Sequence, residues 1–206
     1  LIADLQNQIY AEHPTPTPTP IPDPEWNQLG DDIDGEADYD YSGSYEDSME
    51  SFSYRPNGLS SDGSIVAIGA PYNDGNGDDS GHVRVYQWSG SSWTKLGADI
   101  DGEAAGDSSG SYVSISNDGN TLAIGALYND GNGEDSGHVR VFDWNGSAWT
   151  QRGNDIDGEA ENDRFSRVSI SNDGNTIAVG AYWNDGNGED SGHVRVFDWN
   201  GSVWRS

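Results

Sequence analysis

The feature that most constrains the fold of this chain is an internal repeat. Residues 99–149 and 155–204 are nearly the same sequence, running from DIDGEA through SNDGN and GHVRVFDW to a Trp, and a diverged first copy occupies residues 32–93. The histidines of the GHVRV segments, His82, His138 and His193, are 56 and then 55 residues apart. A tandem period of this size indicates supersecondary units that bury their apolar surface against one another.

Each copy contains four candidate strands. In the middle copy, Tyr112–Ser116 and Thr121–Gly125 alternate apolar with small or polar residues on either side of an Asn-Asp-Gly-Asn turn. His138–Trp144 is the third candidate, and Asn145-Gly146 turns the chain into the fourth, Trp149–Gly153. The repeats have no sustained helical periodicity. The sequence therefore predicts an all-β fold of three tandem four-stranded antiparallel units that resemble propeller blades.

The composition excludes several classes of function. The chain of 206 residues has 36 Asp and Glu against 9 Lys and Arg, a formal charge of −27, which opposes binding to nucleic acid or to an anionic membrane surface. Its apolar runs are too short to span a bilayer. Without cysteine it has no disulfide, thiol nucleophile or cysteine zinc site. Eight Trp and ten Tyr argue against the disorder that this charge would otherwise indicate.

The repeats also resemble a known family. The segment VSISNDGNTLAIGA, followed by an acidic loop and GHVRVF, is similar to the FG-GAP repeats of integrin-α-type β-propellers and their bacterial and algal relatives, over roughly residues 26–206. The Phe-Gly pair of that family is matched only by Phe165-Ser166, and its DxDxDG calcium loop is not reproduced in the usual form. The resemblance implies a propeller-like domain with repeats at about 26–93, 93–149 and 149–204.

The sequence is compatible with three arrangements of the repeats. Trp26-Asn27-Gln28-Leu29-Gly30 matches Trp93–Gly97 and Trp149–Gly153, and Trp204 begins the same strand again, so the amino-terminal copy could complete the last sheet. Three repeats could form a compact closed body, an open arc, or part of a ring that other subunits complete. In the last two cases unpaired sheet edges would recruit other chains. We therefore expect a homo-oligomer or filament, with Trp26 and Leu29 among its contact residues.

Residues 1–25 form a separate amino-terminal arm. Leu1, Ile2, Leu5 and Ile9 have helix-like spacing, which predicts a short helix or a strand that contributes to assembly. The tract PTPTPTPIPDP at 14–24 is extended and stiff, either as a spacer or as an arm that reaches a neighbouring subunit. Thr15, Thr17 and Thr19 are candidate O-glycosylation sites.

Two acidic clusters recur in every repeat. The first has oxygen ligands at alternate positions of a Gly-rich loop, which suits Ca²⁺, and its candidate ligands are Asp74, Asn76, Asp78, Asp130, Asn132, Glu134, Asp185, Asn187 and Glu189. The second is Asp32-x-Asp34-Gly-Glu36 with its two copies. Both clusters are also typical of solvated acidic turns. Because catalytic sites are normally built once whereas these carboxylates recur three times, we expect no enzymatic activity.

The sequence as a whole favours a non-enzymatic structural or adhesive protein that is extracellular or surface-exposed, in a fibre, on a cell surface or on a virion. The alternative is a calcium-dependent module that binds a glycan or a cell-surface protein. The recurring tryptophans are expected to pack between sheets. The first copy carries an insertion of about 11 residues, expected to be a surface loop, and its tyrosines, Tyr39, Tyr41, Tyr45 and Tyr54, are better candidates for contacting a partner.

Overall fold

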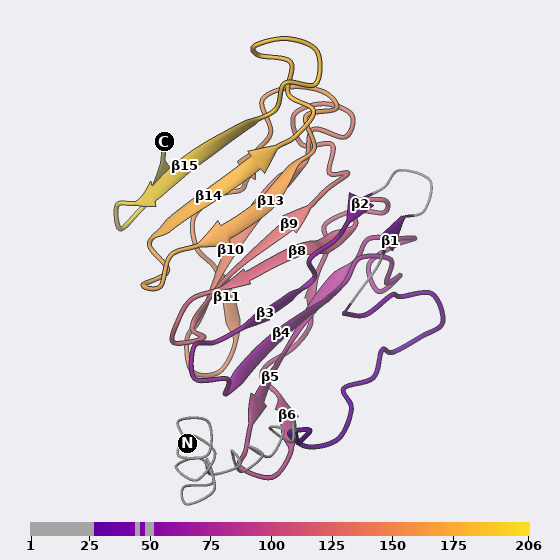
Figure 1. Cartoon of the computed structure of the whole chain (residues 1–206), viewed down its shortest axis with the longest axis vertical. Helices are drawn as coiled ribbons and strands as arrows, with labels where there is room; N and C mark the ends of the chain where they lie inside the picture. The colour runs from indigo at the N-terminus through magenta and orange to yellow at the C-terminus, as the bar shows by residue number, and fades with distance from the viewer. Residues whose placement is uncertain (1–26, 44–45, 48–51) are drawn as a thin grey trace, which may run out of the picture.

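The structure, a computed structural model, describes residues 27–43, 46–47 and 52–206, and these residues form strands and loops (Figure 1). None of them lies in a helix that could cross a membrane. The amino-terminal arm, Trp26 and Tyr45 lie outside the described residues, so the predicted arm helix, the arm's assembly contacts and the glycosylation sites stay predictions.

Three antiparallel four-stranded sheets, which we call blades 1 to 3, confirm the predicted all-β architecture. In blade 1 the strands are β3 (Asn57–Leu59), β4 (Ile65–Ala70), β5 (His82–Trp88) and β6 (Trp93–Lys95). In blade 2 they are β8 (Ser109–Ile115), β9 (Thr121–Ala126), β10 (His138–Trp144) and β11 (Trp149–Gln151). In blade 3 they are β13 (Phe165–Ile170), β14 (Thr176–Ala181), β15 (His193–Trp199) and β16 (Trp204–Arg205).

Two short strands lie between the blades in sequence. β7 (Ile100–Asp101) pairs with β5, and β12 (Ile156–Asp157) pairs with β10, so each adds to the blade that precedes it. Within each blade the strands follow one another as a meander. The turn between the first two strands of blade 2 is fixed by Asp118, whose Oδ1 accepts hydrogen bonds from the Ser116 hydroxyl (2.7 Å) and the Asn120 amide (3.0 Å).

The hydrophobic core lies between the blades. Val83 and Val85 of blade 1 pack with Leu122 and Ile124 of blade 2, and the corresponding Val139 and Val141 of blade 2 pack with blade 3. All four valines are at most 1% exposed, and burying such a side chain contributes roughly 1.5–3 kcal/mol. The front face of blade 1 thus covers the rear face of blade 2, and the front face of blade 2 covers the rear face of blade 3.

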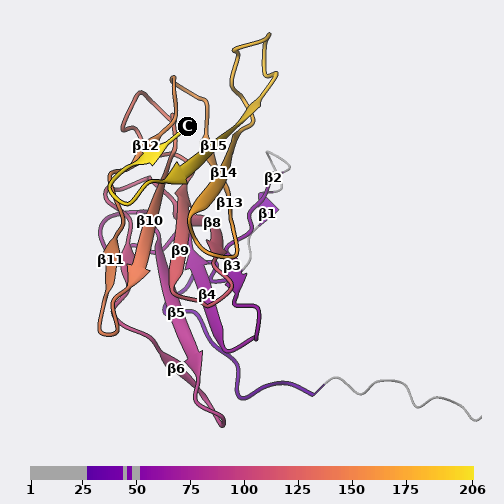
Figure 2. The same ribbon diagram turned by 90° about the vertical axis from the view of Figure 1, so that its left-hand side faces the viewer.

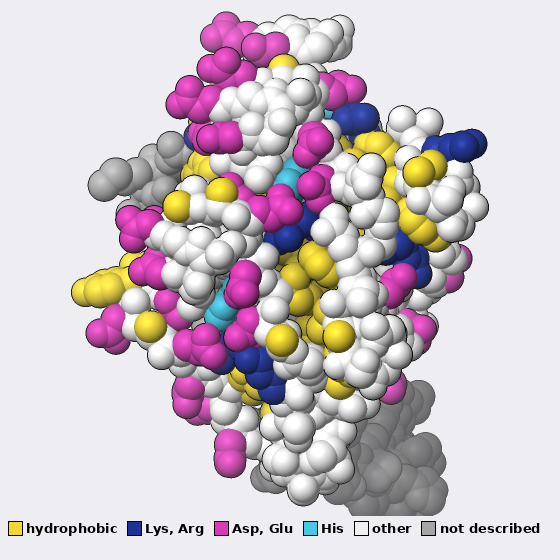
Figure 3. Space-filling model, turned by 180° about the vertical axis from the view of Figure 1, so that it is seen from behind, with side chains coloured by type: hydrophobic (Ala, Val, Ile, Leu, Met, Phe, Trp, Pro, Cys, Tyr) yellow, Lys and Arg dark blue, Asp and Glu magenta, His cyan; other side chains and the backbone are white. Residues whose placement is uncertain are grey.

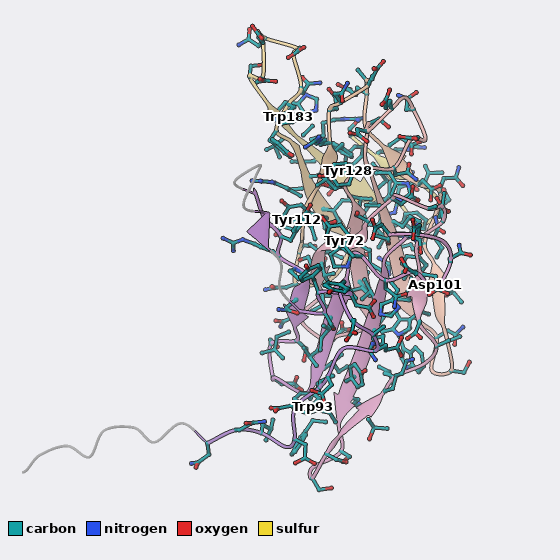
Figure 4. All side chains as sticks on the ribbon, turned by 90° about the vertical axis from the view of Figure 1, so that its right-hand side faces the viewer. Tyr72, Trp93, Asp101, Tyr112, Tyr128 and Trp183 are labelled. Atoms are coloured by element: carbon teal, nitrogen blue, oxygen red, sulfur yellow. The ribbon has the colours of Figure 1, made fainter. Side chains whose placement is uncertain are left out.

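Aromatic and arginine side chains form a second contact between the blades. The Arg164 guanidinium lies 3.8 Å from the ring centroid of Trp183 and 4.9 Å from that of Tyr128. Figure 4 shows Tyr72, Tyr112, Tyr128 and Trp183 along the stack, away from Asp101. Tyr112 is buried together with Tyr54 and Leu127 in a small separate core. Of the recurring tryptophans, Trp149 and Trp204 pack against the cores between the blades, whereas Trp88 and Trp93 lie against each other within blade 1.

The three blades form an open row. The described amino-terminal segment lies beside blade 1 and blade 3 lies at the opposite end (Figures 1 and 2). Residues 27–43 do not complete the sheet of blade 3, whose last strand is its own β16. The described residues of one chain thus do not close on themselves, and an open row is common to the predicted arc and to the predicted ring that other subunits complete.

The insertion in the first copy contains a short hairpin, β1 (Glu46–Asp47) with β2 (Phe52–Ser53). Tyr39 and Tyr41 are 79% and 44% exposed, as expected for residues that could contact a partner. The same expectation for Tyr54 is wrong. Tyr54 is 5% exposed because its ring packs against Tyr112 and its hydroxyl oxygen lies 3.4 Å from that of Tyr72.

Candidate functional site

Three connectors of related sequence precede the three blades. The first connector is residues 30–40, the second is 97–107 and the third is 153–163. The second and third connectors each join one blade to the next, and we call the contact of a connector with the preceding blade a joint. β7 and β12 are the strands of these two connectors. The joints bring together the acidic clusters and the histidines that the sequence singled out.

The acidic Gly-rich loop of each blade has a fixed conformation. In blade 1 the Asn73 Oδ1 atom accepts a hydrogen bond from the Gly75 amide (2.8 Å), and the Asp74 Oδ1 atom accepts one from the Asp79 amide (2.8 Å). The Ser80 hydroxyl donates to the Asn73 carbonyl (3.2 Å). The same pattern recurs at Asn129, Asp130 and Ser136 in blade 2. Local hydrogen bonds of this kind hold a loop without support from a ligand.

This loop receives the connector that follows. The carbonyl oxygens of Asp78, Asp79 and Ser80 accept hydrogen bonds from the amides of Gly106 (2.8 Å), Ser108 (3.0 Å) and Ser109 (3.0 Å). The Asn76 side chain donates to the carbonyls of Gly102 (2.8 Å) and Glu103 (3.2 Å). In the second joint, Asn132 does the same with Gly158 and Glu159. The acidic loop is therefore a docking site for backbone.

Strand pairing completes each joint. Val83 of β5 pairs with Ile100 of the second connector, and Val139 of β10 pairs with Ile156 of the third. The connector then anchors to the next blade, because Arg140 donates to the Asp101 carbonyl (2.7 Å) and the Trp149 indole donates to the Leu96 carbonyl (2.9 Å). The sequence left these segments as either a calcium cluster or an acidic turn, and did not predict strands there; the signal for pairing was the Ile that recurs within each DID segment.

The joint of blade 3 is open. Its acidic loop has the same internal hydrogen bonds, from Gly186 to Asn184 (2.9 Å) and from Asp190 to Asp185 (2.8 Å). In the part of the chain that the structure describes, no connector strand pairs with the start of β15. Val194 and Val196 are consequently 67% and 53% exposed, whereas their counterparts in blades 1 and 2 are buried. Within the described residues, the acidic loop of blade 3 thus has the conformation of the other two loops without a connector bound to it.

Each closed joint also gathers one histidine and two carboxylates. Ligand atoms of Glu36, His82 and Asp99 lie within 4.8 Å of one another, and so do those of Glu103, His138 and Asp155. Histidine, arginine and acidic side chains lie together at successive levels of this face (Figure 3). A neutral imidazole with two carboxylates can bind a divalent cation. An arginine competes for the glutamate, since Arg84 Nη1 is 3.1 Å from Glu36.

Burial sets the charge state of the joint histidines. Together with the nearby positive charge of Arg140, burial lowers the pKa of His138 to about 4. Burial likewise lowers the pKa of His82. Both imidazoles are therefore neutral at pH 7. Burial has the opposite effect on a carboxyl group, and it raises the pKa of Glu103 against the attraction of Arg140.

The predicted calcium ligands lie on the acidic loops, and the structure gives several of them other partners. The side chain of Asp74 accepts a backbone hydrogen bond, and the side chains of Asn76 and Asn132 hold connectors. Calcium binding stays a prediction for the full set: Asp74, Asn76, Asp78, Asp130, Asn132, Glu134, Asp185, Asn187 and Glu189. Leu29, a predicted assembly residue, is 49% exposed, and its carbonyl accepts a hydrogen bond from the Trp93 indole (2.8 Å).

Two cavities of the molecule follow the repeat as well. One is lined by Asp99, Ile100, Arg140 and Trp149, and another by the corresponding Asp155, Ile156, Arg195 and Trp204. Each lies where a connector meets the blade that follows it. These cavities are thus features of the architecture that recur in equivalent places.

Comparisons with known proteins agree with the repeat. Residues 94–142 and 155–197 match the family model of the FG-GAP repeat, which confirms the resemblance at two positions. No match was found among curated proteins.

Three solved structures with a similar fold are TolB from Acinetobacter baumannii (14% identity, TM-score 0.42), the hydrazine synthase of Kuenenia stuttgartiensis (16%, 0.49) and the β-propeller domain of the Trilobed protease from Pyrococcus furiosus (10%, 0.46). The aligned regions cover 75%, 81% and 81% of this chain. They cover 33%, 42% and 42% of those chains, so this chain spans less than half the length of each.

Proposed function

We propose that this chain is a non-catalytic structural or adhesive module that assembles into a fibre or surface appendage. It carries FG-GAP repeats in an open row of three propeller-like blades. It acts outside the cell or on a surface, and it associates through its exposed sheet edges and its amino-terminal arm. The observation that supports this proposal best is the open joint of blade 3.

The open joint favours association for two physical reasons. The start of β15 offers unpaired backbone groups, and an exposed strand edge is a template for another strand. Beside it, Val194 and Val196 expose apolar surface that the two other blades bury. Covering both valines would contribute a few kcal/mol, since a buried valine contributes about 1.5–3 kcal/mol.

Light scattering after size-exclusion chromatography, together with negative-stain electron microscopy, tests the proposal. We expect the purified chain to form oligomers whose mass rises with concentration and which appear as filaments or rows. Val194→Asp should lower the mass because it places a charge on the exposed face. Ser89→Asp, which places the same charge on an exposed hairpin turn of blade 1, is the control. A monomer at every concentration would contradict the proposal.

A calcium-dependent module that binds a glycan or a protein is the second candidate. It is favoured by the grouping of carboxylates in the acidic loops. In the loop of blade 1, burial and the negative charges of Asp74 and Asp78 raise the pKa of the Asp79 carboxyl group. Calorimetric titration with Ca²⁺ should then release or absorb heat, and EDTA should lower the melting temperature. No heat and an unchanged melting temperature would exclude this candidate.

A further inference from the structure

One cavity is lined by residues from all three blades. It has a volume of about 390 Å³, and its walls include Arg55, which leads into β3, Tyr112 of β8 and Arg167 of β13. β8 lies beside both β3 and β13 (Figure 1). Tyr112 lies away from Asp101 of the joint (Figure 4). The cavity is therefore separate from the joints, and because every blade contributes to it, it does not depend on what adjoins either end of the row.

The two arginines of this cavity are not paired with acidic residues. Positive charge is scarce in the chain, which has 9 Lys and Arg against 36 Asp and Glu. Five arginines have a carboxylate oxygen at 2.6–3.6 Å, namely Arg84, Arg140, Arg152, Arg164 and Arg195. Among the described residues, Arg55 and Arg167 have no such partner, and both are exposed. Two guanidinium groups thus line one cavity without a carboxylate to balance their charge.

The Tyr112 hydroxyl is an unpartnered polar group at the same place. Tyr112 is 5% exposed, and its buried oxygen makes no hydrogen bond of ordinary geometry within the described part of the chain. Burial raises the pKa of Tyr112, whereas the positive charges of Arg167 and Arg55 oppose this rise, so both charges lie near the hydroxyl. Because a buried hydroxyl normally has a partner, this one indicates a group that binds in the cavity.

The surrounding structure holds both arginines in position. The Arg55 amide donates to the Ser111 carbonyl (3.1 Å), and the Arg55 carbonyl accepts a hydrogen bond from the Val113 amide (3.0 Å). The Arg167 guanidinium lies 5.4 Å from the ring centroid of Tyr112 and 4.7 Å from that of Tyr182. Stacking of this kind uses the face of the guanidinium and leaves the N–H groups at its edge available. A ligand therefore meets a prepared pair of donors.

We propose that this cavity binds a small organic carboxylate of the sugar-acid class, with its carboxylate between Arg55 and Arg167. The planar fork of a guanidinium matches a carboxylate with two parallel hydrogen bonds. The Arg167 side chain, which lies over the Tyr112 ring, turns toward the ligand, and a carboxylate oxygen then accepts a hydrogen bond from the Tyr112 hydroxyl. The site is formed by one chain, so this inference goes beyond the proposed function and does not rest on self-association.

The remaining walls of the cavity favour a sugar acid over a bare carboxylate. Asn57 and Ser169 add polar side chains, and Val113 and Val168 add apolar ones. A sugar ring presents hydroxyl groups at its edge and C–H groups on its faces, which suits a wall of this mixed kind. The volume is in the range of small-molecule sites, about 300–1,000 Å³, and exceeds what a lone carboxylate fills.

The charge of the whole chain favours a ligand with a single negative charge. A net charge of −27 repels every anion that approaches, and it repels a dianion such as phosphate about twice as strongly as a monoanion. Short hydrogen bonds from two arginines can outweigh this repulsion for one carboxylate, because the chain's own carboxylates lie farther from the ligand than the guanidinium groups. A sugar acid carries one such group.

Calorimetric titration with glucuronate tests the inference. We expect saturable binding of one glucuronate per chain, in the presence of EDTA so that calcium plays no part. Glucose, the neutral analogue of the same shape, should give no heat, and acetate and phosphate should bind about tenfold more weakly or less. The full chain is used, and light scattering on the same samples records its oligomeric state.

Four variants locate the site. Arg55→Gln and Arg167→Gln should each weaken glucuronate binding about tenfold or more, because each removes a charge-assisted pair of hydrogen bonds. Tyr112→Phe keeps the ring and should weaken binding without lowering the melting temperature, since the hydroxyl has no partner in the free protein. Arg205→Gln, which removes the same charge from an exposed position of β16 outside the cavity, is the matched control and should bind normally.

The contrary outcomes are equally clear. The inference is overturned if glucuronate gives no heat, if glucose binds as well, or if Arg205→Gln weakens binding as much as Arg167→Gln does. Acetate that binds as tightly as glucuronate, or phosphate that binds more tightly, would overturn the assignment to a sugar acid. A chain that binds glucuronate but stays monomeric would contradict the proposed function and leave this site intact.

Discussion

At the scale of single residues, the repeat places the same side chain in closed and open surroundings. His138 is 2% exposed within a closed joint, whereas the side chain of His193 at the open joint is 27% exposed. Position in the row, and not residue type, thus decides the environment. Sequence reasoning identified the three histidines as equivalent but could not distinguish them, because burial depends on which blade follows.

The buried histidine predicts a dependence of stability on pH. Because burial lowers the pKa of His138 from 6.5 to about 4, the unfolded chain binds a proton between these values and the folded chain does not. The stability of the folded state is therefore intact above pH 6.5 and decreases as the pH falls toward 4, by about 3 kcal/mol from this group.

Urea unfolding at pH 7 and pH 4.5 measures this effect by comparison with His138→Gln, which cannot titrate. The stability difference between the two proteins should shrink at the lower pH. Acidic groups shared by both proteins cancel in the comparison. An equal loss of stability in both proteins would contradict a neutral buried His138.

At the scale of elements, the strands were predictable and the joints were not. The alternation in HVRVFDW and the turn in SNDGN identify β10 and the β8–β9 hairpin, because both signals are local. Ile100–Asp101 and Ile156–Asp157 are two-residue strands within acidic segments, and they exist because β5 and β10 offer an edge. Such pairing depends on distant residues and leaves little local pattern.

The docking role of the acidic loop yields a prediction with a control inside the chain. Asn132→Ala removes two hydrogen bonds to the third connector and should cost about 1–2 kcal/mol of folding free energy. Asn187→Ala, in a loop that holds no connector among the described residues, should leave folding stability within about 0.5 kcal/mol. Thermal unfolding of both variants checks this, and equal losses would contradict the docking role.

At the scale of the whole molecule, the charge of −27 must be reconciled with self-association. Two copies that meet through apolar faces and strand edges repel each other over the Debye length, about 10 Å at 0.1 M salt. The repeats and the all-β class followed from the sequence. The open row did not, because the three arrangements share the same strands and differ only in how blades twist against one another.

Salt should therefore strengthen assembly. Between 50 mM and 500 mM NaCl we expect the dissociation constant to fall by about tenfold or more, because screening removes repulsion between the acidic loops. Sedimentation velocity measures the change, and Val194→Asp should remain monomeric across the range. Dissociation at high salt would indicate that ion pairs, and not apolar faces, hold the copies together.

The amino-terminal arm can be separated from the blades by deleting residues 1–25. If the arm adds contacts beyond the exposed edge of blade 3, the deletion should shorten the fibres and leave smaller oligomers, which Val194→Asp should still dissociate. A protein that is monomeric after the deletion alone would show that the arm is needed for association itself.

The central claim is that copies of this chain associate through the exposed edge of β15, and hydrogen–deuterium exchange measures it directly. Peptides covering residues 192–196 should exchange quickly in dilute solution and slowly when the chain assembles. The equivalent peptide of β10, residues 137–141, is covered within the chain and should exchange slowly at both concentrations. Exchange in residues 192–196 that does not change with concentration would contradict the account.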